Sequence, residues 1–71
     1  MSDTTPTHVL QAVANNARGI GPGPTVTRAE WQKYATDLGG WFMWWGEMID
    51  VSAKSIGGGM YQIKGVKRYA E

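Results

Sequence analysis

Tryptophan is concentrated in one short segment of this chain. Three of the four tryptophans fall within Trp41–Trp45, with a phenylalanine and a methionine between them. The chain has 71 residues and no cysteine, so disulfides and thiolate metal sites are excluded as supports for the fold. A chain of this length is marginally stable unless it packs large side chains well or gains a partner. The aromatic segment must therefore supply core, bind another molecule, or do both.

The N-terminal third of the chain carries one helix signal and one linker signal. Thr5 is a suitable helix cap, Pro6 suits the first helical position, and apolar residues follow at helical spacing. Gly19 is well placed to end this first helix. The glycine- and proline-rich stretch 19–26 then predicts a linker between the first helix and the rest of the chain.

The stretch that begins at Thr27 gives the clearest helix signal. Thr27 and Glu30 have the spacing of a capping box, and apolar residues follow at i, i+3, i+4 and i+7. The apolar spacing continues past Gly39 and Gly40, so residues 28–50 form either two helices with a tight turn or one long helix. We favour two helices, because two adjacent glycines inside a helix cost about 2 kcal/mol relative to alanines.

On a helix, the aromatic segment has a wide apolar arc that the rest of a small domain cannot fully cover. The helical spacing predicts a core nucleus made of Trp31, Leu38, Phe42, Trp45 and Ile49. Side chains that point away from this nucleus would remain exposed, and tryptophan and methionine are frequent in binding surfaces. The predicted protein-binding residues on this helix face are Trp41, Met43, Trp44 and Met48.

The C-terminal part of the chain is rich in β-forming residues. Gly57–Gly59 separates two such runs, which predicts a β-hairpin. The alternative extends the preceding helix through residues 51–56 and uses Gly57 as its cap. With the hairpin, the expected fold class is α+β, with two or three short helices followed by a C-terminal β-hairpin.

We expect a single small domain over residues 1–71, with a flexible N-terminus at 1–4. The first residues lack the pattern of a secretory signal, and no apolar run approaches the ~20 residues that span a bilayer. A cytoplasmic protein without a membrane span is therefore expected.

The net charge of +1 hides an asymmetry, because the middle of the chain is weakly acidic and its end is basic. A nucleic acid is attracted by such cationic side chains through its phosphates. The alternative, nucleic-acid-binding set consists of Lys54, Lys64, Lys67 and Arg68.

The order TRAEW, then WW, then GGGMYQIKGVKRY resembles small phage excisionases over about residues 27–69. The resemblance implies a winged-helix module that binds DNA, with a Trp-bearing helix, a second helix and a glycine-containing wing. The chain departs from this pattern at residues 41–50, which offer no Arg, Lys, Asn or Gln to a base edge. Glu47 and Asp50 in this segment would also repel phosphates. DNA binding through the basic hairpin alone is the alternative function.

Catalysis is poorly supported. His8 is the only histidine, and it lies near the N-terminus, far in sequence from any partner for nucleophilic chemistry. Glu47 and Asp50 lie three residues apart, a spacing that is typical of the solvated edge of a helix. We expect no enzyme activity, cofactor, metal or small-molecule substrate. The favoured function is a protein-binding module, a small accessory or inhibitory factor of the phage or mobile-element type, whose partner is another protein or a second copy of the chain.

Overall fold

The computed structural model of the chain describes residues 5–68, which form two helices and four strands. Helix α1 spans Thr7–Ala17, β1 Thr25–Thr27, α2 Arg28–Leu38, β2 Trp41–Trp44, β3 Glu47–Gly57 and β4 Met60–Arg68. The strands form one antiparallel sheet in the order β1-β4-β3-β2. The predicted α+β class with a C-terminal hairpin is confirmed. The N-terminus expected to be flexible, 1–4, lies outside the described residues.

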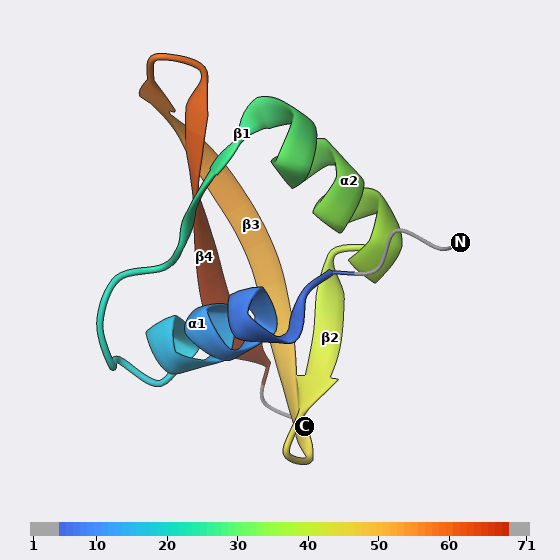
Figure 1. Cartoon of the computed structure of the whole chain (residues 1–71). Coiled ribbons are helices and arrows are strands. Elements are labelled where there is room, and N and C mark those ends of the chain that lie inside the picture. Colours follow the sequence, from blue (N-terminus) through green and yellow to red (C-terminus); the bar gives the residue numbers. More distant parts are fainter. Residues whose placement is uncertain (1–4, 69–71) are drawn as a thin grey trace.

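Both helices pack on the same face of the sheet (Figure 1). Helix α1 crosses β4 and β3, while α2 lies against β1 and β4. The core between these layers consists of Val9, Val13 and Ala14 of α1, Tyr34 of α2, and Val26, Phe42, Ile49 and Ile63 of the strands. No described helix covers the opposite face of the sheet, which we call the open face.

Helix α2 begins with the capping box that the sequence predicts. The Glu30 backbone N–H donates to Thr27 Oγ1 over 3.1 Å, and the Thr27 backbone N–H donates to Glu30 Oε1 over 2.9 Å. The hydrogen bond from the Thr27 backbone lowers the pKa of Glu30, because it stabilises the carboxylate form. The helix ends at Gly39, whose φ of 67° is the left-handed conformation of a glycine C-cap.

The start of α1 differs from the prediction. Pro6 occupies the N-cap position, and no side chain caps the helix. Thr5 instead joins the two helices: its backbone N–H and its hydroxyl both donate to Asp37 Oδ2 near the end of α2, over 2.9 and 3.0 Å. Thr5 is buried by this contact, so its hydroxyl serves tertiary structure rather than helix capping.

The predicted linker 19–26 is partly a strand. Its end belongs to β1, and residues before β1 continue along the edge of β4, where the Ile63 backbone N–H donates to the Pro24 carbonyl over 2.9 Å. Gly23 is buried against this edge, and a Cβ there would lie 1.6 Å from the Ile63 carbonyl oxygen. The linker therefore protects the β4 edge that would otherwise carry unpaired backbone groups.

The predicted helix across residues 41–50 is wrong, in both its two-helix and its one-helix form. This segment is the β2–β3 hairpin, with Trp45 and Gly46 as a two-residue turn at φ values of 51° and 80°. Positive φ at both positions is the geometry of a type I′ turn, which matches strand twist. A short, continuous apolar run fits helical and strand spacing equally well, which explains the error. Residues 51–56, left open between strand and helix, belong to β3.

Strand alternation assigns each side chain to one face of the sheet. Phe42, Ile49 and Ile63 point into the core, so residues two positions away on each strand share their face. The opposite parity faces away from the helices. The open face therefore carries residues 41 and 43 of β2, 48, 50, 52 and 54 of β3, and 62, 64, 66 and 68 of β4.

We predict that Gly65→Ala destabilises the protein by about 2 kcal/mol, because the site is already closely packed. A Cβ at Gly65 would lie 2.4 Å from the Val13 carbonyl oxygen and 2.8 Å from Val13 Cγ1. Urea unfolding measures the loss. Val66→Ala, on the neighbouring open-face position, is the control and should cost less than about 1 kcal/mol. Equal losses in both variants would contradict the close approach of α1 to β4.

Candidate binding surface

The open face carries an apolar patch at the end of the sheet formed by β2. Trp41, Met43 and Val66 are 39%, 53% and 47% exposed, and Met48 is half-buried between them. Met43 lies directly opposite Met48, which is diagonal to both Trp41 and Val66 in the strand register. We call these four residues the apolar patch.

Three of the four predicted protein-binding residues, Trp41, Met43 and Met48, belong to the apolar patch. Trp44 does not, because it lies on the helix side, half-buried against the core. Its ring meets Phe42 edge-on, with centroids 6.2 Å apart and planes at 80°. Val66 was not predicted as a site residue. The sequence did contain a signal for it. The hairpin strand was predicted, and Val66 has the same parity as Lys64 and Arg68, so strand alternation places it on the same face.

Trp45 departs furthest from its predicted role in the core. It is 86% exposed at the tip of the β2–β3 turn. Its φ of 51° makes it the only non-glycine residue with positive φ among residues 5–68. A bulky side chain in this conformation costs of order 1–3 kcal/mol, and such strain is concentrated at functional positions. The rest of the predicted nucleus is nearer the expectation: Phe42 and Ile49 are buried, and Trp31 and Leu38 pack against the core.

The Arg68 side chain borders the apolar patch. Arg68 donates through Nε and Nη2 to the two carboxylate oxygens of Asp50, and the Nε bond is 3.1 Å long. The Arg68 guanidinium carbon also lies 5.6 Å from the Trp41 ring centroid, within cation–π range. The hydrogen bond from Arg68 lowers the pKa of Asp50, since it favours the carboxylate. Three strands are thereby joined across the open face.

The four predicted nucleic-acid-binding cations do not form one set. Lys67 lies on the helix face of β4, where its Nζ is 2.8 Å from Glu47 Oε2. The hydrogen bond from Lys67 lowers the pKa of Glu47. Arg68 is held by Asp50. Lys54 and Lys64 are exposed on the open face, and neither has an ion pair with any residue in the described part of the chain.

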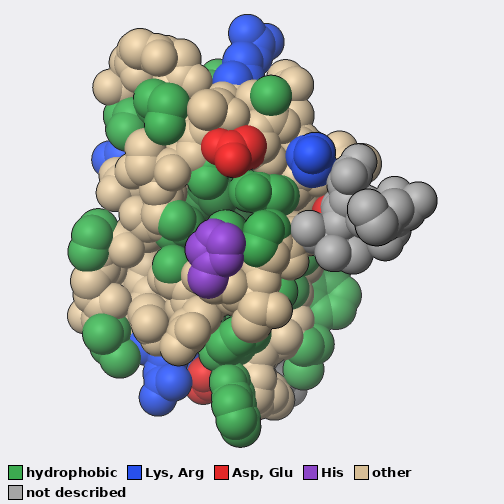
Figure 2. All heavy atoms as spheres, in the orientation of Figure 1, with side chains coloured by type: hydrophobic (Ala, Val, Ile, Leu, Met, Phe, Trp, Pro, Cys, Tyr) green, Lys and Arg blue, Asp and Glu red, His purple; other side chains and the backbone are tan. Residues whose placement is uncertain are grey.

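The remaining titratable groups do not come together. Glu47 and Asp50 lie on opposite faces of β3 and have separate cationic partners. His8 is exposed on α1, and Figure 2 shows it on the helix-bearing side of the molecule, among hydrophobic side chains between the two helices. Within residues 5–68, no group of three or more His, Cys, Asp or Glu side chains is arranged to hold a metal ion.

Comparison with known proteins adds no relative. No protein-family model matches the chain, and neither a curated protein nor a solved structure matches it. Over the described residues, neither helix has the length and apolarity needed to traverse a bilayer. The open face is therefore the feature from which a function can be inferred.

We predict that Trp45→Asn raises the free energy of unfolding by about 1 kcal/mol, because asparagine adopts positive φ more readily than tryptophan. The exposed indole contributes little buried surface that the substitution could remove. Urea denaturation measures the change. Trp45→Val is the matched control and should lower stability, since a β-branched side chain is disfavoured at positive φ. Reduced stability of the asparagine variant would show that the indole makes stabilising contacts.

A second prediction concerns the Asp50–Arg68 ion pair and pH. Because the folded pKa of Asp50 is below its ordinary value of 3.8, its stabilising contribution is complete above that value. The contribution is lost as pH falls through the lower folded pKa. Asp50→Asn should therefore be less stable than the wild type at neutral pH, and the difference should shrink as pH falls below 3.8. Denaturant unfolding across this range tests the sign, and a constant difference would exclude an electrostatic origin.

Proposed function

We propose that this protein is a non-enzymatic binding module that docks on a protein partner through the apolar patch of its open sheet face. One observation carries the proposal. Trp41, Met43, Met48 and Val66 come from three strands and converge on the face that no described helix covers. Contiguous exposed apolar surface of this kind is typical of protein–protein contact sites.

The chemistry of the patch suits a protein surface. Tryptophan buries a large area at low entropic cost, and methionine adapts to an irregular neighbour. Trp41 is fixed by the cation contact from Arg68, so less side-chain freedom is lost when a partner covers it. The patch also lies at a sheet edge, where Trp41 and Met43 of β2 leave backbone groups available to a further strand.

The two carboxylates nearest the patch do not have the properties of a general acid. Each is held by a cation, Asp50 by Arg68 and Glu47 by Lys67, and each has a lowered pKa. A general acid at neutral pH requires a raised carboxyl pKa instead. The size of the chain suits an accessory or inhibitory factor that works by occupying another protein's surface.

The groove-reading mode of DNA binding has no structural support. Residues 41–50, which a winged-helix module would place in the major groove, form a β-hairpin. Lys54 and Lys64, which have no ion pair in the described part of the chain, lie outside the apolar patch.

Site-specific crosslinking tests the proposal. A photo-crosslinking amino acid at position 43 should yield one dominant crosslinked protein in the cells that carry the gene. The same amino acid at Ile20, which is 59% exposed but away from the open face, should not yield it. With that partner purified, Trp41→Ala should weaken binding by about 30-fold, the effect expected for a hot-spot tryptophan. Ile20→Ser is the matched control and should bind like the wild type.

Sedimentation of the purified protein identifies the case in which the partner is a second copy. A dimer that Met43→Glu dissociates would assign the patch to self-association, which is still protein docking. Absence of any crosslink at position 43, or the same product from positions 43 and 20, would overturn the proposal.

A further inference from the structure

A concavity opens on the open face toward the edge of the sheet away from β2, beside the linker that precedes β1. Its volume is about 350 Å³. The lining comes from the C-terminal end of α1, the linker, β3 and β4. The side chains with polar groups at this concavity are Asn16, Ser52, Lys54, Gln62 and Lys64.

The wall of the concavity is fixed by hydrogen bonds. Asn16 Nδ2 donates to the Gly21 carbonyl over 3.1 Å, and Asn16 Oδ1 accepts from the Gly65 backbone N–H over 3.0 Å. Gln62 Nε2 donates to the Gly23 carbonyl over 3.4 Å. These contacts hold the linker against α1 and β4, so the concavity exists before any ligand binds. A preformed site loses less entropy on binding.

The charge at the concavity has one sign. Lys54 and Lys64 line it, and no carboxylate is among its lining residues. In the strand register Ser52 lies opposite Lys64 and Gln62 opposite Lys54, so the two lysines are diagonal neighbours. Such neighbours lie about 7–8 Å apart, with their Cβ atoms somewhat closer. The nearest acidic residue along β3 is Asp50, and Arg68 already neutralises it.

We infer that this concavity binds the phosphate groups of a nucleic-acid strand. Two lysines at diagonal spacing present two separate positive charges, which suits phosphates that follow one another along a backbone. No aromatic side chain lines the concavity, so it offers no stacking surface to a base and its contacts would be to phosphates. Ser52 adds a hydroxyl donor, a group that commonly contacts phosphate oxygens. Recognition is therefore of the backbone and independent of base sequence.

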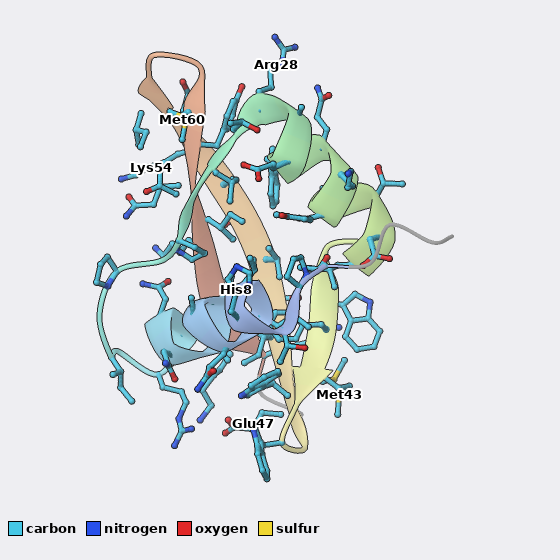
Figure 3. All side chains as sticks on the ribbon, viewed as in Figure 1. His8, Arg28, Met43, Glu47, Lys54 and Met60 are labelled. Carbon is cyan, nitrogen blue, oxygen red and sulfur yellow. The ribbon has the colours of Figure 1, made fainter. Side chains whose placement is uncertain are left out.

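This site is independent of the proposed protein docking. It shares no residue with the apolar patch, and Figure 3 shows Lys54 and Met43 projecting at opposite ends of the molecule. A substitution at Lys54 or at Met43 therefore leaves the other site unchanged.

Fluorescence anisotropy with a labelled oligonucleotide, single-stranded or duplex, tests the inference as salt concentration is raised. Engagement of two phosphates predicts a slope of log K against log salt of about −1.4 for the single strand and about −1.8 for the duplex. Lys54→Gln and Lys64→Gln should each weaken binding and reduce the slope by about half. Two variants serve as controls: Arg28→Gln, a cation at the start of α2 away from the concavity, and Met43→Ser, in the apolar patch. Both should retain the wild-type slope.

Pyrophosphate distinguishes a free anion from a strand. When concentrations are expressed per phosphate, pyrophosphate should displace the labelled oligonucleotide only at concentrations well above that of the oligonucleotide. Pyrophosphate binding as tight as oligonucleotide binding would overturn the assignment to nucleic acid. So would the absence of binding at low salt, or equal effects of the lysine variants and Arg28→Gln.

Discussion

The close approach of α1 to the central strands at Gly65 is the contact on which the surface chemistry depends. The Val13 backbone sits where a side chain at position 65 would be, so α1 can lie only on that face of β4. Because side chains alternate along a strand, this single contact also decides which residues of β3 and β4 are covered. The two helices, of 11 residues each, cover one face of the sheet and leave the other face uncovered.

The bare face is divided by charge. On β3 Asp50 lies between Met48 of the apolar patch and Lys54, whereas Arg68 lies opposite Met48 at the outer end of the patch, and both members of the pair are well exposed. Exposed ion pairs contribute about 0–1 kcal/mol to stability. The main effect of this pair is therefore to position the two side chains rather than to stabilise the fold. It orients Arg68 over Trp41 and neutralises the carboxylate that would otherwise weaken the field at Lys64. On the open face, the net positive charge therefore lies at the concavity, with Lys54 and Lys64.

Local chemistry made some of these features predictable. The capping box at Thr27 and Glu30, the stop at Gly39 and the hairpin at Gly57–Gly59 each depend on a few adjacent residues, and the structure contains all of them. The segment 41–50 failed because its apolar side chains satisfy both the helical and the strand period. The alternation of apolar and polar residues from Ile49 to Lys54, together with Gly46 just before it, was the signal for a turn followed by a strand.

The same error explains which site residues could be predicted. Trp41, Met43 and Met48 were chosen as surplus apolar surface, a criterion that holds for helix or strand. Their grouping with Trp44 used helical geometry, and strand alternation separates it from them.

The basic set shows the same limit, since Lys67 differs from Lys64 only in strand parity. Neither the concavity nor Asn16's link from α1 to β4 has a local sequence pattern, because both arise from contacts between residues distant in sequence.

The distance between the two surfaces constrains how they work together. The two surfaces adjoin on β4, where Val66 and Lys64 lie two residues apart on the open face, roughly 7 Å at about 3.3 Å per residue. Their far members on β3, Met48 and Lys54, are roughly 20 Å apart. Both surfaces lie on one continuous hydrogen-bonded sheet, which keeps their relative orientation constant. A protein seated on the apolar patch and a nucleic-acid strand in the concavity would therefore be held side by side on the same face. Taken together, the two proposals imply an adaptor that would place a partner beside a nucleic-acid backbone without reading its sequence.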